Sequence, residues 1–358
     1  MSCNQANPLP TSLAMILNEI TKAQLEKRRG VVRVLTAVAD TPFENLLEDY
    51  RRFGIEIDCN EVASENGFKL LSCTSARRLY TYDFVLTGSF HVLTNNSFVF
   101  FITGEKGLFF KKMIKSLVRV VYPELLRANI LTGEIHKLLE DFVDKTKTEL
   151  RYNEFWGKKL FGEAFTVKKH EKRLEVEDYE LFPKAFLDAR EQGGWLDRIT
   201  VFNKNLNFTI ARNGVLKFKK GTFSDYYQHF FSKIIDFVTT RWKIFEKKGR
   251  AEQPEKEVRP ILVEFENDVF SDEMIKKHFV RELSDYPHCS YSIIHGGNPH
   301  LYLSVLDRVD NSSFSIRTYG TNALLISPQI RTTKAALVRF STYLLNNFQE
   351  GKMVDFQA

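Results

Sequence analysis

A run of short apolar segments between residues 55 and 104 constrains the fold more than any other feature of the chain. The segments are rich in rings or alternate between apolar and polar residues, and they read IEIDCNEV, GFKLLSCTS, RLYTYDFVLTGS and FHVLTNNSFVFFITG. Asn-Gly, Gly-Ser and Asn-Asn pairs punctuate them, and such pairs are typical of tight turns between strands. The sequence therefore predicts an antiparallel meander in this region.

Longer segments with helical spacing follow the meander. In the segment 107–126 the apolar residues Phe110, Met113, Ile114, Leu117 and Val121 fall on one face of a helix. The segments 132–150, 222–245 and 332–348 also predict helices. The expected fold class is α+β, with antiparallel sheets packed against long amphipathic helices.

The domain organisation is predicted from length and from one charged segment. A chain of 358 residues exceeds the usual size of one domain, which is roughly 150 residues. The segment EKKGRAEQPEKEVRP (246–260) is almost wholly charged and contains Gly and Pro, which is typical of a linker. The expected parts are a flexible lead-in (1–12), an N-terminal α+β domain (13–150), a middle α+β region (151–248), a charged linker (249–260) and a C-terminal α+β domain (261–358).

A spacing of two apolar residues and a glycine recurs along the chain. It occurs at Phe98, Phe100 and Gly104, at Phe208, Ile210 and Gly214, and at Phe314, Ile316 and Gly320. The recurrence fits repeated strand-turn-strand-helix units, although any unit of this kind can produce it. From Ile261 onward the expected order of strand, helix, strands and helix resembles a half-unit of the TATA-box-binding-protein fold, in which a curved antiparallel sheet carries helices on one face. The resemblance concerns element order alone and assigns no binding residue.

Cysteine spacing and hydropathy bear on location. The four cysteines Cys3, Cys59, Cys73 and Cys289 form no C-x-x-C pair, so we expect no disulfide framework and favour a reducing, cytoplasmic compartment. The sequence shows no secretory signal pattern and no run of about 18 apolar residues, so we expect no membrane partner.

The histidine-rich stretch HCSYSIIHGGNPHLYLSVLDR (288–308) predicts a hairpin with a Gly-Gly-Asn-Pro turn. His295 and His300 flank the turn and are weak candidates for metal ligands, because two imidazoles fall short of the four ligands of a structural zinc site. The spacing of His300 and Asp307 is similar to the phospholipase-D-like pattern His-x-Lys-x4-Asp. Tyr302 occupies the lysine position, so the cation that would hold phosphate is missing.

Catalytic and cofactor motifs give no assignment. The sequence contains no phosphate-binding loop, no H-E-x-x-H, no G-x-S-x-G and no Rossmann glycine pattern. We therefore predict no cofactor and no metal, and catalytic residues stay unknown. Because catalytic triads are defined by geometry, an enzyme with scattered residues stays an open alternative.

Basic clusters are the most informative functional signal. Lys111, Lys115 and Arg119 recur every four residues with Lys112 beside them, which predicts a basic stripe over 106–119. The other clusters are Lys217, Lys219 and Lys220, then Lys168, Lys169, Lys172 and Arg173, and in the C-terminal region Arg317, Arg331, Lys334 and Arg339.

Three function classes follow from these features. The net charge is +6, and basic stripes of this kind suit the phosphates of DNA or RNA, so the leading hypothesis is a non-catalytic, cytosolic nucleic-acid-binding protein. The alternative is a Phe-rich assembly subunit that binds a protein partner or a second copy of itself, since the chain has 31 phenylalanines. A nuclease or phosphodiesterase with an unplaced active site is the third.

Overall fold

The computed structural model describes residues 8–27, 30–39, 41–79, 84–95, 98–121, 124–168, 179–246, 248–250, 259–286, 289–296 and 300–356. The described residues combine helices with antiparallel sheets, which confirms the α+β class. They form two compact units. The first unit is Met1–Gly157, Thr166–Ala189 and Leu196–Val238, and the second is Lys158–Phe165, Arg190–Trp195 and Thr239–Ala358.

The larger of the two sheets lies mainly in the first unit. Its strands are β1 (Val32–Ala39), β2 (Ile55–Glu65), β3 (Phe68–Leu79), β4 (Phe84–Asn95), β5 (Phe98–Thr103), β6 (Leu125–Arg127), β7 (Arg151–Lys159), β8 (Ala164–Lys168), β9 (Gly194–Phe202), β10 (Asn207–Ala211) and β11 (Val215–Lys220). The spatial order is β2-β3-β4-β5-β1-β11-β10-β9-β7-β8, and β6 pairs with β1. The strands predicted as a meander follow one another in this sheet, and β1 connects them to β11 of the middle region.

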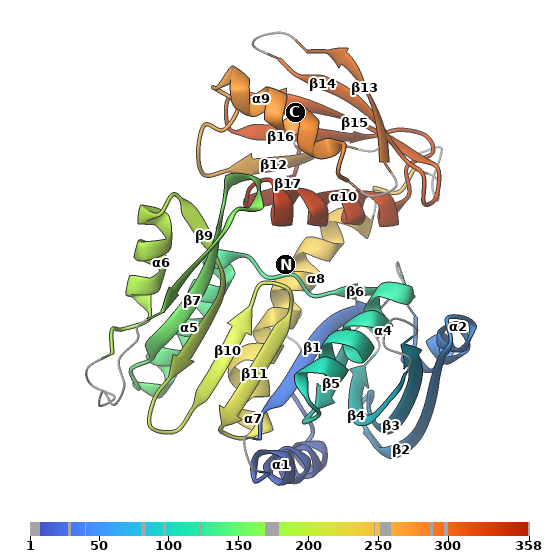
Figure 1. Cartoon of the computed structure of the whole chain (residues 1–358), viewed down its shortest axis with the longest axis vertical. Helices are drawn as coiled ribbons and strands as arrows, with labels where there is room; N and C mark the ends of the chain where they lie inside the picture. The colour runs from blue at the N-terminus through green and yellow to red at the C-terminus, as the bar shows by residue number, and fades with distance from the viewer. Residues whose placement is uncertain are drawn as a thin grey trace. The chain divides into compact units, whose positions relative to one another are not determined.

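Helices cover both faces of the large sheet. They are α1 (Thr11–Leu25), the 3-10 turn η1 (Phe43–Leu46), α2 (Leu47–Arg52), α3 (Gly107–Phe109), the π-helical turn η3 (Phe110–Ile114), α4 (Lys115–Val120), α5 (Thr132–Thr146), α6 (Pro183–Glu191), α7 (Phe223–Tyr226), the π-helical turn η6 (Tyr227–Phe231) and α8 (Ser232–Glu246). On one face, Leu35 and Val215 pack in a core cluster with Leu117 of α4. On the other face, Phe208 of β10 contacts Phe230 of η6, which stacks on Phe142 of α5. Figure 1 shows α4 in front of the sheet and α5 behind it.

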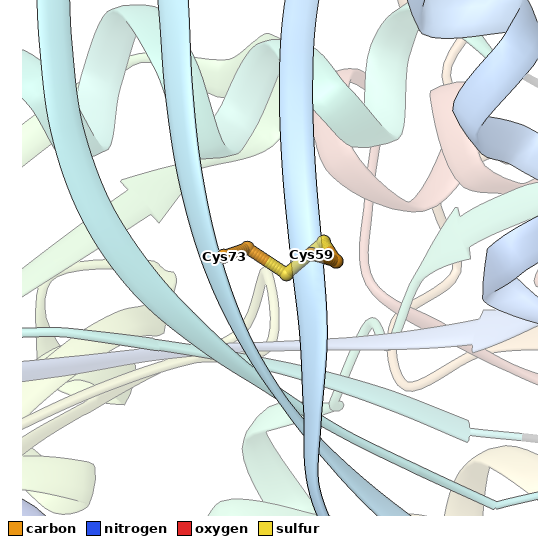
Figure 2. Close-up of a disulfide and its surroundings, with 2 residues drawn as sticks. All are labelled: Cys59 and Cys73. Carbon is orange, nitrogen blue, oxygen red and sulfur yellow. A yellow bond between two sulfur atoms is a disulfide. The ribbon is translucent and has the colours of Figure 1, made fainter.

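A disulfide links the second and third strands (Figure 2). Cys59 of β2 and Cys73 of β3 lie directly opposite each other, and their Cα atoms are 4.2 Å apart. The expectation of no disulfide framework did not anticipate this bond between Cys59 and Cys73. Their spacing of 14 residues becomes informative only once the register of the β2–β3 hairpin is known.

The second unit contains the smaller sheet. Its strands are β12 (Ile261–Phe265), β13 (Cys289–His295), β14 (Tyr302–Asp307), β15 (Ser312–Tyr319), β16 (Ala323–Pro328) and β17 (Gly351–Asp355), in the spatial order β13-β14-β15-β16-β12-β17. Its helices are α9 (Glu273–Leu283) and α10 (Lys334–Asn347), and it includes the 3-10 turn η4 (Leu160–Gly162). Phe340 of α10 contacts Phe314 of β15. The elements from Ile261 follow the expected order of strand, helix, strands and helix, with β17 added.

The recurring Phe and Gly spacing does not occupy equivalent strands. Phe98 lies in β5, which leads directly into α3. Phe208 lies in β10 and Phe314 in β15, and another strand follows each of these before the next helix. The structure does not confirm the repeated units. Within the described residues, no helix is long and apolar enough to cross a membrane.

Candidate nucleic-acid interface

The alternation of side chains along β11 directs Lys217 to the α4 side of the sheet. Phe218 is buried on the opposite side, where its ring stacks on Tyr226 of α7. Val215 is on the α4 side and packs in the same cluster as Leu117. Since successive strand residues point to opposite faces, Lys217 shares the face of Val215. Its side chain is half-buried.

Polar side chains continue from Lys217 across neighbouring strands. Arg33 of β1 lies opposite Lys217 on one side, and Thr209 of β10 lies opposite on the other. Thr209 is in turn opposite Thr200 of β9, and their Oγ1 atoms are 2.8 Å apart. Paired residues in a sheet point to the same face, so these four residues form one row. The Arg33 guanidinium donates to the carbonyl oxygen of Glu105 at 2.7 Å.

Arg198 lies next to this row. It precedes Thr200 by two residues on β9 and therefore shares its face. The Arg198 guanidinium lies 3.6 Å from the ring centre of Trp156 on β7, close enough for a cation–π interaction that fixes the side chain. Its Nε atom is buried and has no hydrogen-bond partner among the described residues.

Lys115 approaches from the helical segment that covers this face. The sequence predicted a continuous helix with Lys111, Lys115 and Arg119 in one stripe. The π-helical turn η3 occupies Phe110–Ile114 and interrupts the α-helical spacing. Lys111 and Arg119 are exposed, whereas Lys115 is half-buried. The guanidinium of Arg127 donates to the carbonyl oxygen of Lys115 at 3.1 Å, which holds another cation beside it.

Lys115, Arg198 and Lys217 form what we call the cation cluster. The charges of Lys217 and Arg198 lower the pKa of Lys115, and the charge of Arg198 lowers that of Lys217. Burial is the largest cause of the lowered pKa of Lys115, and it is also the largest cause for Lys217. Among the described residues, no Asp or Glu forms an ion pair with any of the three.

Flanking charges act on the same groups. Arg127 also lowers the pKa of Lys115, and Arg33 lowers that of Lys217. Among the described residues, the carboxylate that raises the pKa of Lys217 is that of Glu154, two residues before Trp156 on β7. Positive charge therefore exceeds negative charge at the cluster.

The remaining predicted residues of the first unit lie outside the cation cluster. Lys219 and Lys220 are exposed at the end of β11, and the Lys220 ammonium donates to the carbonyl oxygen of Lys204. Lys112 is half-buried, and its carbonyl oxygen accepts a hydrogen bond from Arg77. The side chains of the predicted cluster Lys168, Lys169, Lys172 and Arg173 lie outside the described residues.

The predicted basic residues of the second unit have separate environments. Arg317 of β15 and Arg331 are exposed. The ammonium of Lys334 lies 4.0 Å from the ring centre of Trp242. Arg339 donates to the carboxylates of Asp307 and Asp310 at 2.7 and 2.9 Å, so internal ion pairs neutralise its charge.

The histidine hairpin does not assemble a metal site within the described residues. His295 of β13 lies opposite Tyr302 of β14, and His300 precedes β14. His288 lies outside the described residues. In the part of the chain that the structure describes, no three His, Cys, Asp or Glu side chains lie close enough together to hold a metal ion.

Sequence reasoning missed Arg198, Trp156, Arg33 and Arg127. Alternation within LDRITVF directs Arg198 to the face of β9 opposite that of the buried Ile199. Only the pairing of β9, β10 and β11 places Arg198 near Lys217. No known family model matches this chain, and a search of curated proteins finds no relative.

Proposed function

We propose that this chain is a non-catalytic nucleic-acid-binding protein that contacts backbone phosphates of DNA or RNA through the cation cluster. The observation that supports this function is the meeting of Lys115, Arg198 and Lys217, which come from three elements far apart in sequence. All three are half-buried, and no carboxylate among the described residues pairs with them.

The energetic reason is the cost of burying charge. A cation that is partly removed from water and surrounded by other cations is less stable than one in solvent. An external anion bound at the cluster offsets this cost, and phosphate matches both lysine and arginine donors. The cluster therefore destabilises the free protein, and a bound anion relieves this destabilisation.

Exposed cations on neighbouring elements favour a polyanion over a single small anion. Lys111 and Arg119 lie on either side of Lys115 in sequence, and Lys219 lies two residues beyond Lys217. Lys111 lowers the pKa of Lys115, and Lys219 lowers that of Lys217, so both exposed lysines are within electrostatic range. Each further phosphate contact releases counterions and adds affinity.

The cytoplasmic location remains part of the proposal. The Cys59–Cys73 disulfide counts against it, because such bonds are rare in a reducing compartment. For the third class, a nuclease or phosphodiesterase, the described part of the chain assigns no catalytic residue.

The assembly alternative depends on exposed rings, and the structure offers few. Of the 31 phenylalanines, Phe53 and Phe84 are the two that are exposed. The others fill cores or are half-buried. The abundance of phenylalanine is therefore explained by packing and does not require a protein partner.

Fluorescence anisotropy with a labelled single-stranded oligonucleotide at low salt tests the function. We expect the wild-type protein to bind DNA or RNA. The variant K115Q/R198Q/K217Q should bind about tenfold or more weakly, because it loses both phosphate contacts and counterion release.

The matched control is K22Q/K137Q/K145Q, which removes the same net charge from exposed positions on α1 and α5. Its affinity should stay close to that of the wild-type protein. Absence of binding by the wild-type protein would refute the proposed function. Equal losses in the two variants would show that binding depends on net charge and not on the cluster.

A further inference from the structure

The cations around the site fall into two classes by burial. The inner class is the cation cluster, whose three side chains are half-buried. The outer class consists of exposed residues on the same helical segment and on β11, namely Lys111, Arg119 and Lys219. A ligand that satisfies both classes must contact half-buried cations and also extend along exposed ones.

The inner position has donors suited to a compact oxyanion. Besides two ammonium groups and one guanidinium, the hydroxyls of Thr200 and Thr209 lie on the same face as Lys217. The Arg198 guanidinium lies 3.6 Å from the ring centre of Trp156, and this contact fixes one set of donors. A preorganised donor set loses little entropy when an anion binds.

The charge of the inner position distinguishes two kinds of phosphate. A phosphodiester within a strand carries one negative charge, whereas a phosphate monoester carries roughly 1.5 to 2 and has three acceptor oxygens. Three mutually repelling cations are better neutralised by the monoester.

From these observations, which rest on the proposed function, we infer that the cation cluster binds the terminal phosphate monoester of a single strand, while Lys111, Arg119 and Lys219 contact the diester phosphates that follow. The protein then binds phosphorylated ends of single strands in preference to unphosphorylated ends.

Four labelled oligonucleotides of one sequence test this inference at pH 7.5 and low salt. They carry a 5′-phosphate, a 3′-phosphate, hydroxyls at both ends, or a 5′-phosphate capped as its methyl ester. One of the two monoesters should bind about tenfold more tightly than the hydroxyl and capped forms, because only it presents the additional charge and acceptor oxygens.

Two variants separate the roles of the two classes. K115Q/R198Q/K217Q should remove the preference for the phosphorylated end and leave weaker binding that no longer depends on the end. K111Q/R119Q/K219Q should bind all four oligonucleotides more weakly by a similar factor and keep the preference for the phosphorylated end. Thermal unfolding of each variant confirms that it is folded.

The outcomes also separate this inference from the proposed function. If all four oligonucleotides bind the wild-type protein equally, the end-binding inference is wrong and nucleic-acid binding stands. If none binds, nucleic-acid binding is wrong as well. If inorganic phosphate raises the melting temperature while no oligonucleotide binds, the cluster is a site for small anions and both statements are overturned.

Discussion

At the scale of single residues, Lys115 and Lys217 are in environments that disfavour their charged forms. Each is half-buried, the charge of Arg198 lowers the pKa of both, and the charge of Lys217 also lowers that of Lys115. Proteins tolerate such groups mainly where they are needed for binding or catalysis. The free protein should therefore be less stable than a version that lacks one of these charges.

Replacing either lysine with methionine tests this cost. K115M and K217M should each raise the free energy of unfolding by about 0.5–2 kcal/mol, since methionine keeps the packing of the aliphatic chain and removes the repulsion. Urea denaturation measures the change. The exposed control K137M should stay within about 0.5 kcal/mol of the wild-type value. Destabilisation by both cluster variants would show that the ammonium groups stabilise the fold.

The pH dependence of binding follows from the same lowered pKa values. Burial and neighbouring cations hold the pKa of each lysine below its ordinary value of 10.5, so each ammonium group titrates at a lower pH than in the unfolded chain. Oligonucleotide affinity should therefore fall as the pH rises toward 10.5. Stability of the free protein should rise over the same window, because there the unfolded chain binds more protons than the folded chain.

A bound phosphate favours the ammonium form, so binding in this alkaline window should also take up protons. Calorimetry in buffers with different ionisation enthalpies measures that uptake. In K115M/K217M both the uptake and the loss of affinity should disappear. Proton uptake that persists in this variant would assign the titration to other groups.

The sequence identified two members of the cluster but not the third. Lys115 and Lys217 stand in obviously basic segments, so composition was sufficient to select them. Arg198 stands in LDRITVF beside Asp197, and nothing local distinguishes it from an ordinary surface arginine. Its role depends on the pairing of β9 with β10 and of β10 with β11, which is a non-local property.

At the scale of elements, the π-helical turn η3 changes what the basic stripe can do. An uninterrupted α-helix would space Lys111, Lys115 and Arg119 evenly along one side. With the turn at Phe110–Ile114, Lys115 is half-buried while the other two are exposed. Apolar spacing predicted the helix and its buried face, but it does not distinguish a π-helical turn from a regular one.

The disulfide of the β2–β3 hairpin gives a prediction for stability. Reducing Cys59–Cys73 should lower the free energy of unfolding by roughly 2–3 kcal/mol, because the bond closes a short loop in the unfolded chain. Denaturant unfolding of the wild-type protein with and without reductant measures the loss. Reductant should leave the free energy of unfolding of C59A/C73A unchanged. An identical midpoint for the wild-type protein under both conditions would show that the pair contributes nothing to stability.

At the scale of the whole molecule, one sheet contains strands from the N-terminal and middle regions. The meander and the α+β class were predictable, because alternation and turn residues are local signals. The pairing of β1 with β11 was not, since it joins residues about 180 positions apart through backbone hydrogen bonds that leave no sequence pattern. That pairing places Arg33 beside Lys217, so the candidate interface exists only in the folded chain.

The central claim is that phosphates bind at the cation cluster, and the salt dependence of oligonucleotide affinity tests it most directly. The logarithm of the affinity should fall linearly with the logarithm of salt concentration, by about 0.7 for each phosphate contacted on a single strand. The slope for K115Q/R198Q/K217Q should be shallower than that for the wild-type protein by about one such contact or more, and the slope for K22Q/K137Q/K145Q should match the wild-type value. Equal slopes for the wild-type protein and the cluster variant would contradict the account.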